Sequence, residues 1–215
     1  MEVMSHRRNA RHCLLIIAFT LSLLGMPSLS DAGDPAFDCR KASGEIEKLI
    51  CNNDALSQLD RDLATTYDAA IKMAASLDSG ASTAVKELRA EQRGWIKGRN
   101  ECWKDISDKL DCTKQSYQRR IAFLQARWRL VEPIKTVFYR CTNDTDTFIV
   151  SFMPTTPRDS LAIERGDTIG IFVRTRATSG AKYDGSFGKS FWSHGDEAMI
   201  TWDQNIPALE CQVQE

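Results

Sequence analysis

The 215-residue sequence predicts an α + β chain of two domains, in which a helical domain precedes a domain of short antiparallel β-strands. Apolar residues up to Val131 recur at helical spacing, whereas those after Glu132-Pro133 alternate with polar residues as they do in strands. A third observation is an N-terminal segment with the pattern of an export signal. We therefore expect a signal segment at residues 1–32, a helical domain at 33–131 and a β domain at 132–215.

The first 32 residues have the composition of a secretory signal peptide. Arg7, Arg8 and Arg11 precede an apolar run over residues 14–26, and small residues follow over 28–32. The run is short for a membrane span, and Cys13 precedes it, so we expect neither a stable membrane anchor nor a lipid-modified cysteine. The mature protein is then soluble, periplasmic or secreted, and begins near Asp31 or Gly33, with an uncleaved anchor as the alternative.

Three apolar stripes at helical spacing predict the helices of the first domain. The first stripe begins at Asn53 or Asp54 as N-cap and ends at Asp78-Ser79-Gly80, and the second follows Ser82 or Thr83 as its cap. The stripes consist of Leu56, Leu59, Leu63, Tyr67, Ala70, Ile71 and Ala74; of Val85, Leu88, Gln92, Trp95 and Arg99; and of Tyr117, Ile121, Leu124 and Trp128. Short connections favour an antiparallel hairpin with the third helix packed across it.

Three residues of the second stripe, Gln92, Trp95 and Arg99, share one helical face. They could form a polar recognition strip around an aromatic anchor. We favour a structural role, in which Trp95 fills the core while Gln92 and Arg99 bond loop carbonyls near the cysteines.

Six cysteines remain once the signal segment is removed: Cys39, Cys51, Cys102, Cys112, Cys141 and Cys211. An even set in an exported chain is typical of a disulfide framework, so we expect three bonds. We expect no metal or other cofactor, because His194 is then the one histidine that remains. The helical hairpin would bring the first four cysteines to one end of the bundle, where local and crossed pairings are both possible.

The charge of the exported chain is slightly acidic, with 25 basic and 28 acidic residues. Residues 31–131 contain 17 basic and 16 acidic residues, while residues 132–215 contain 8 basic and 12 acidic residues. This acid excess in the second domain favours a basic protein partner and disfavours nucleic acid as a ligand.

Eight segments of the second domain have the alternation of strands, and Gly, Pro, Asn and Asp separate them. They cover residues 137–141, 147–152, 160–163, 168–173, 182–183, 190–192, 197–202 and 209–213.

Two polar loops in this domain carry a resemblance to a known family. Ser179-Gly180-Ala181-Lys182-Tyr183 and the segment 191–198, which holds His194-Gly195, are bracketed by Cys141 and Cys211. The combination resembles the MliC/PliC inhibitors of C-type lysozyme, whose Ser-Gly-x-x-Tyr and Lys-Gly loops plug the active-site cleft of the enzyme. The resemblance implies an eight-stranded antiparallel β-barrel, in which a Cys141–Cys211 bond would join the first strand to the last.

The resemblance also implies roles for the first loop. Ser179 would enter a cleft lined by two carboxylic acids, where a hydroxyl can donate to one group and accept from the other. Gly180 would let the loop turn, and Tyr183 would brace it by packing its ring.

The second loop departs from the family pattern. His194 stands before Gly195 where the family carries lysine, and an imidazole is mostly neutral at neutral pH. Lys182 or Lys189 would then supply the cation for the carboxylate of the enzyme.

The helical domain resembles a second family, the LprI-type N-terminal domain of exported bacterial proteins, over roughly residues 35–127. The residues that carry this resemblance are Phe37-Asp38-Cys39, Glu47, Ile50-Cys51, Leu59-Asp60, Glu91-Gln92-Arg93-Gly94-Trp95, Arg99-Asn100, Cys102, Tyr117 and Arg119-Arg120-Ile121. One member of that family is itself a lysozyme inhibitor. Most members of that family have no assigned role, so the resemblance of the β domain to the MliC/PliC inhibitors is the one that implies an exported inhibitor of C-type lysozyme rather than an enzyme.

Two other classes of function stay open. A hydrolase would need Ser179 or Ser186, His194 and Asp196 as a triad, but the sequence contains no Gly-x-Ser-x-Gly elbow, and His194 and Asp196 are two residues apart. The other class is a non-catalytic module of the cell envelope that binds protein or glycan.

Overall fold

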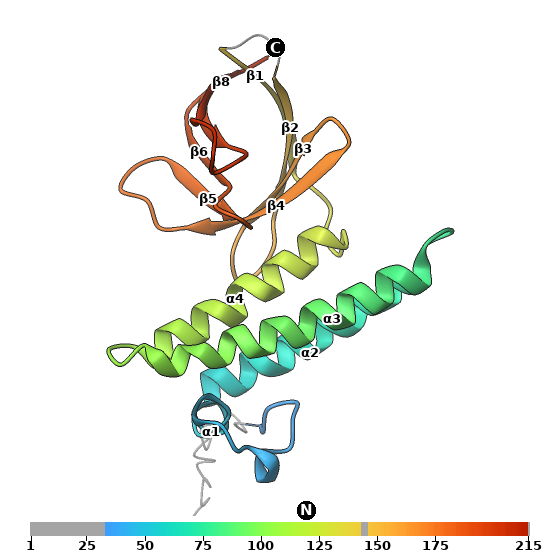
Figure 1. The fold of residues 1–215 in the computed structure, drawn as a ribbon, viewed down its shortest axis with the longest axis vertical. Coiled ribbons are helices and arrows are strands. Elements are labelled where there is room, and N and C mark those ends of the chain that lie inside the picture. Colours follow the sequence, from blue (N-terminus) through green and yellow to red (C-terminus); the bar gives the residue numbers. More distant parts are fainter. Residues whose placement is uncertain (1–32, 143–145, 215) are drawn as a thin grey trace, which may run out of the picture. The chain divides into compact units, whose positions relative to one another are not determined.

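The computed structural model describes residues 33–142 and 146–214. Within these residues, helices linked by disulfides come first and a closed antiparallel β-barrel follows (Figure 1), which confirms the predicted fold class. The predicted signal segment lies outside the described residues, which belong to one compact unit, so the domain boundary at residues 131 and 132 stays a prediction. Among the helices described, none has both the length and the apolar content needed to cross a membrane.

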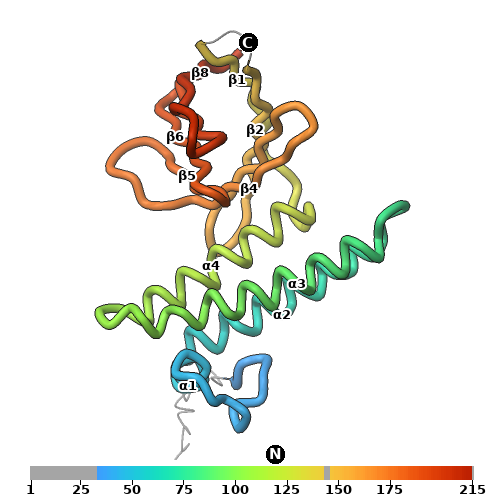
Figure 2. Tube along the Cα trace, in the orientation of Figure 1, coloured from blue at the N-terminus to red at the C-terminus, as the bar shows by residue number. Residues whose placement is uncertain are grey.

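Helices α2 (Asp54–Ala75) and α3 (Ala81–Asn100) form the predicted hairpin and lie side by side (Figure 1, Figure 2). Asn53 is the N-cap of α2, because its side chain accepts a hydrogen bond from the Leu56 N–H at 3.0 Å. This cap fixes the start of the helix at one of the two predicted positions.

The predicted cap of α3 is wrong. Ser82 and Thr83 lie inside the helix, whose N-cap is Gly80. Gly80 has a φ of 73°, in the left-handed region that glycine adopts without strain. The chain therefore reverses at Gly80, and the helix begins directly after it without a side-chain cap.

Helix α4 (Lys109–Arg127) is the third predicted helix, and helix α1 (Glu45–Cys51) has no counterpart among the predictions. Two hydrogen bonds hold the start of α1, because the Glu47 carboxylate accepts from the N–H groups of Ser43 and Gly44 at 3.0 and 3.1 Å. Two turns give too few apolar positions for a periodic pattern to be recognised.

The four cysteines of the helical part pair locally. Cys39 bonds to Cys51 at the end of α1, and Cys102 bonds to Cys112 in the first turn of α4. The crossed pairing that the sequence left open is therefore not used. Bonds that close loops of this size stabilise a small helical core by about 2–4 kcal/mol each.

Apolar residues from all four helices form one core. The buried members are Ile46, Ile50, Leu56, Leu63, Ala70, Ala74, Leu88, Cys102, Tyr117, Ile121 and Leu124. The three predicted stripes therefore face inward, with the Ile46 and Ile50 side chains of α1 added to them.

Eight antiparallel strands close the barrel in chain order, each pairing with the next and the last pairing with the first. They are β1 (Lys135–Cys141), β2 (Thr147–Met153), β3 (Ser160–Arg165), β4 (Thr168–Thr175), β5 (Ala181–Gly185), β6 (Ser190–His194), β7 (Glu197–Thr201) and β8 (Leu209–Val213). Cys141 and Cys211 lie directly opposite each other in the β1–β8 register and are bonded. Closure pairs the edge strands with each other, so the sheet has no free edge that could template aggregation.

Alternate residues of the strands fill the barrel interior. In β1, for example, Val137 and Tyr139 are buried while Phe138 is exposed. The largest inward side chains are aromatic, including Phe172 and Phe191, and both are fully buried. The interior is therefore a packed core, and polar chemistry belongs to the loops and to the outer face.

Helix α4 also contacts the barrel. Ala126 packs with Met153 and Ile171 in a small apolar cluster, and the Gln125 side chain accepts a hydrogen bond from the Thr156 N–H at 2.9 Å. The loops that carry Ser179 and His194 supply none of these residues.

Candidate functional site

The first polar loop, residues 176–180, connects β4 to β5 and carries Ser179. Its next residue, Gly180, has a φ of 65°. A Cβ atom at this position would lie 2.2 Å from the Ser193 carbonyl oxygen, far closer than atoms can approach. Glycine is therefore the residue that allows the Ser179 loop to lie against the end of β6.

The second polar loop is the tight turn between β6 and β7. It consists of Gly195 and Asp196, with His194 as the last residue of β6 and Glu197 as the first of β7. Gly195 has a φ of 59°, which suits the two-residue turns that match the twist of antiparallel strands. The turn leaves His194 exposed at the end of its strand.

The structure brings Ser179 and His194 together. The Ser179 Oγ lies 3.0 Å from the His194 Nε2, and the tautomer of the ring decides which atom donates. The sequence predicts two separate probes, one from each loop. The structure instead joins them as one polar pair on the exposed surface.

Trp192 holds this pair in place, and sequence reasoning did not include it among the site residues. Its indole Nε1 donates to the Ser179 carbonyl oxygen at 2.9 Å, and its ring contacts the His194 ring edge-on with centroids 4.8 Å apart. Residues two apart on a strand share one face, so the position of Trp192 before His194 was the available signal. Trp192 thus restrains both the backbone of Ser179 and the ring of His194.

Tyr183 lies beneath the loop rather than on its surface. The side chain is buried in the barrel core, where its ring contacts Phe191, and Arg174 Nη1 donates to its hydroxyl at 3.4 Å. Burial raises the pKa of Tyr183, partly opposed by the nearby Arg174 charge. Tyr183 therefore anchors β5, the strand that follows the Ser179 loop, as a neutral phenol.

The two candidate lysines lie at different ends of the β5–β6 hairpin. Lys182 is opposite Trp192 in the strand register, so both side chains are on the same face next to the polar pair. Lys189 follows the turn at the other end, and its Nζ lies 3.8 Å from the centre of the Trp202 ring. Of the two lysines, Lys182 is the one that the structure brings near Ser179 and His194.

A hollow of about 370 Å³ adjoins the polar pair on the outer face of β6, β7 and β8. Trp192 and His194 form the side next to the pair, and Met199, Glu197 and Glu210 continue it across the strands. The Trp192 and Met199 side chains can pack against the methylene groups of a long basic side chain from a partner protein. The carboxylates of Glu197 and Glu210 can neutralise its charge.

The Ser179–His194 pair has two of the three members of a hydrolytic triad. Within residues 33–142 and 146–214, however, His194 makes no hydrogen bond or ion pair to a carboxylate, so no acid orients its ring. Ser186, the other candidate nucleophile, lies at the opposite end of the β5–β6 hairpin. The same described residues contain no cluster of His, Cys, Asp and Glu side chains that could hold a metal ion.

The fold and this surface define a class of protein: a small barrel, closed by a disulfide, that presents a restrained polar pair on glycine-containing loops. Comparison with known families agrees with this class. Residues 139–208 match the family of membrane-bound lysozyme inhibitors of C-type lysozyme, MliC, and residues 39–124 match the family of the lysozyme inhibitor LprI. Both predicted resemblances are confirmed, in the predicted order.

Similar proteins are found among curated sequences and solved structures. Lipoprotein LprI from Mycobacterium bovis and from two strains of Mycobacterium tuberculosis is 26% identical over 192 residues, covering 87% of this chain and 91% of the relative. The structure of Pseudomonas aeruginosa MliC in complex with hen egg white lysozyme matches with 22% identity and a TM-score of 0.33, covering 37% of this chain and 81% of that one.

Proposed function

We propose that this protein is an exported inhibitor of C-type lysozyme and that the Ser179–His194 pair enters the active-site cleft of the enzyme. One observation is the main support for the proposal. Ser179 and His194 are 15 positions apart, on two loops that resemble the inhibitory loops of the MliC family, and they meet at 3.0 Å on the exposed surface. The matches to two lysozyme-inhibitor families support it. The signal-like composition of residues 1–32 supports a periplasmic or secreted location.

The chemistry of the pair fits a glycosidase cleft, where one carboxyl group is protonated and the other is ionised. When the His194 ring is protonated, both of its nitrogens donate, so Nε2 donates to the Ser179 oxygen. The hydroxyl hydrogen of Ser179 is then free to donate to the ionised carboxylate, while the oxygen is fixed in place. The pair therefore presents a donor and a positive charge together, as the family lysine does with its ammonium group.

Charge on the same domain supports association with a basic enzyme. Residues 132–215 contain 12 acidic and 8 basic residues. Glu197 and Glu210 line the hollow beside the pair, where they would meet basic side chains at the rim of the cleft.

We also propose that the protein does not catalyse hydrolysis, because no carboxylate of the described residues bonds to the His194 ring and Ser179 bonds to an exposed ring. An activated ester such as p-nitrophenyl acetate tests this point. Hydrolysis that Ser179→Ala abolishes, at catalytic rates in the absence of lysozyme, would contradict it.

The central experiment titrates a purified C-type lysozyme with the full mature chain and measures the residual lysis of bacterial cell walls. Ser179→Ala should weaken inhibition by about tenfold to a hundredfold, because it removes hydrogen bonds to charged groups. Ser186→Ala is the matched control, since Ser186 is exposed at the other end of the β5–β6 hairpin. Inhibition that is absent at micromolar excess, or equal in both variants, would contradict the proposed site.

A further inference from the structure

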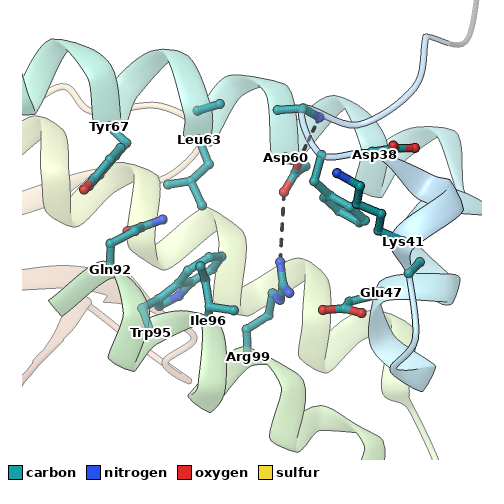
Figure 3. Close-up of a pocket in the computed structure, with 14 residues that line it drawn as sticks. Asp38, Lys41, Glu47, Asp60, Leu63, Tyr67, Gln92, Trp95, Ile96 and Arg99 are labelled. Carbon is teal, nitrogen blue, oxygen red and sulfur yellow. Dashed lines mark hydrogen bonds and ion pairs between the residues drawn. The ribbon is translucent and has the colours of Figure 1, made fainter. Parts of the chain in front are cut away.

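A second candidate site lies in the helical part, where a cavity of about 410 Å³ opens between α2, α3 and the segment over residues 36–42 (Figure 3). Its volume falls in the range of pockets that bind small ligands. The proposed inhibition of lysozyme uses none of its lining residues, so the cavity has no role in the function argued above.

The floor of the cavity is a closed network of buried charges. Arg99 and Asp60 are 5% and 9% exposed, and Tyr117 lies between them. Arg99 Nη1 donates to the Tyr117 hydroxyl at 2.6 Å, and that hydroxyl donates to Asp60 Oδ1 at 2.7 Å. Burial raises the pKa of Tyr117, so the phenol stays neutral and can both accept and donate.

The other charges at this end of the cavity are also engaged. Asp38 forms an ion pair with Arg40 at 2.9 Å, and the Glu47 carboxylate accepts the two backbone N–H groups at the start of α1. Arg99 lies 4.0 Å from Asp60, and Lys41 is an exposed cation of the lining. The lining thus has little net charge, which favours neither a phosphate nor an isolated cation.

The opposite wall has hydrogen-bonding groups that have no partner among the described residues. Arg120 Nε donates to Gln92 at 3.0 Å, and because arginine can only donate, the amide oxygen of Gln92 must face it. The amide NH₂ of Gln92 and the hydroxyl of Tyr67 make no hydrogen bond with any described residue. Figure 3 shows Tyr67 and Gln92 directed into the same part of the cavity as Leu63 and Trp95.

Trp95 supplies the aromatic surface of this wall. Its ring is half-buried, contacts Tyr117 edge-on with centroids 5.2 Å apart, and has the Arg99 guanidinium 5.4 Å from its centre. These contacts fix the ring in place, so little side-chain entropy remains to be lost when a ligand packs against it.

We propose that this cavity binds a neutral saccharide, one or two sugar rings of a glycan. Sugar rings combine apolar C–H faces, which pack on a fixed aromatic ring, with hydroxyls that donate and accept. The Gln92 amide and the Tyr67 hydroxyl would form hydrogen bonds with those hydroxyls. The Asp60 carboxylate is already satisfied by the Tyr117 hydroxyl and the Ala36 N–H, so the floor would not attract ions. This site is separate from the Ser179–His194 pair and does not depend on inhibition of lysozyme.

The test is calorimetric titration of the full mature chain, without lysozyme, against chitotriose and maltotriose. Saturable binding of at least one of the two is expected. Tyr67→Phe and Gln92→Glu should each weaken it about three- to tenfold, because the first removes a hydroxyl and the second an amide NH₂ group, while side-chain volume is nearly kept. Gln92→Glu also keeps the oxygen that accepts from Arg120, so the fold around the cavity is preserved.

Tyr139→Phe, a matched change in the barrel, is the control, and it should leave sugar binding unchanged. Circular dichroism establishes that each variant is folded, and all three variants should inhibit lysozyme as the unmodified protein does. Absence of saturable binding by either sugar at millimolar concentration would overturn the proposal. So would binding that both cavity variants leave unchanged, or saturable binding of arginine amide in place of the sugars, which would assign the cavity to a basic peptide.

Discussion

At the scale of single residues, the chemistry of the barrel surface depends on pairs. Ser179 alone is a loop hydroxyl and His194 alone is an exposed imidazole, but at 3.0 Å each sets the hydrogen-bonding state of the other. Trp192 then fixes both, through one hydrogen bond and one ring contact. A substitution at any of the three should therefore affect the other two.

Inhibition should depend on pH through His194. If the protonated ring faces an ionised carboxylate in the complex, binding takes up a proton, so inhibition strengthens as the pH falls from about 8 to about 6. His194→Lys should bind more tightly at the upper end of this range and flatten the slope, because lysine is charged throughout.

Both proteins should be titrated against the same lysozyme at each pH, so that ionisation of the enzyme's own carboxyl groups affects both curves equally. Unchanged affinity and unchanged slope in His194→Lys would show that this residue does not face the carboxylate. Lys182 would then be the candidate cation, since it lies beside Trp192.

At the scale of elements, the two loops use glycine for different reasons. Both Gly180 and Gly195 have positive φ angles, but only at Gly180 would an added Cβ collide with the backbone of β6. At Gly195 the space around the position of a Cβ is open. One glycine therefore permits close packing of a loop, whereas the other permits only a tight turn.

Gly180→Ala should reduce both stability and inhibition more than Gly195→Ala does. The second change has the cost of a left-handed alanine, about 1–2 kcal/mol. The first adds a contact at 2.2 Å with the Ser193 carbonyl oxygen, so the loop must move and the Ser179–His194 bond must lengthen. Urea unfolding and the inhibition assay measure both effects, and equal losses in the two variants would contradict the packing argument.

The start of α1 should be sensitive to acid. Hydrogen bonds from the Gly44 and Ser43 N–H groups lower the pKa of Glu47 below its ordinary value, because they favour the ionised carboxylate. The stabilisation is therefore complete above the unfolded pKa, near 4.5, and is lost as the pH falls through the lower folded value.

Glu47→Gln should reduce the dependence of the unfolding free energy on pH below this point, while costing up to about 1 kcal/mol at neutral pH. Glu87→Gln, an exposed position on α3, is the control and should keep the dependence of the unmodified protein. A variant at Glu47 that loses stability in acid as steeply as the control would show that this cap does not contribute.

At the scale of the whole molecule, the helical part and the barrel part, the two halves of the described structure, each have their own disulfide bonds. Two disulfides lie within the helical part and one joins β1 to β8, and no bond among the described cysteines connects the two halves. The halves meet through α4, where Ala126, Met153 and Ile171 share an apolar cluster. This contact is small compared with the core of either half.

Residues 132–215 alone should fold and inhibit a C-type lysozyme, because the Ser179–His194 pair and the closing disulfide both lie within them. The fragment would expose Met153 and Ile171, so a modest loss of stability is expected without loss of inhibition. Circular dichroism and the inhibition assay provide the measurement. A folded fragment that leaves lysozyme active, while the full chain inhibits it, would transfer the activity to the helical half.

The sequence was sufficient for most of the secondary structure. Stripes such as Leu56, Leu63 and Ala70 on α2, and the alternation of Val137 and Tyr139 on β1, arise from the local geometry of helices and strands. Two local features were not predicted from the sequence: the start of α3 and the whole of α1. Ser82 and Thr83 have typical cap composition, but the left-handed Gly80 starts α3 before them, and α1 is too short for periodicity.

The structural role predicted for Gln92, Trp95 and Arg99 is also partly wrong. In the described structure, Gln92 and Arg99 make no hydrogen bond to a loop carbonyl. Gln92 bonds instead to the Arg120 side chain, and Arg99 bonds to the side chains of Tyr117 and Asn100. Trp95 is half-buried beside a cavity rather than fully enclosed in the core. Helical spacing placed these residues on one face, but two of their partners, Arg120 and Tyr117, come from α4 and could not be identified from α3 alone.

The sequence by itself determined the fold class, the even set of cysteines, the charge of each half and the two loops that resemble inhibitor loops. The tertiary structure decided which residues meet: Ser179 with His194, Cys39 with Cys51, and Gln92 and Tyr67 across one cavity. The physical reason is the sequence separation of the residues that interact. Periodicity, caps and turns depend on neighbours a few residues away, whereas a hydrogen bond between two loops depends on how every strand between them pairs and twists.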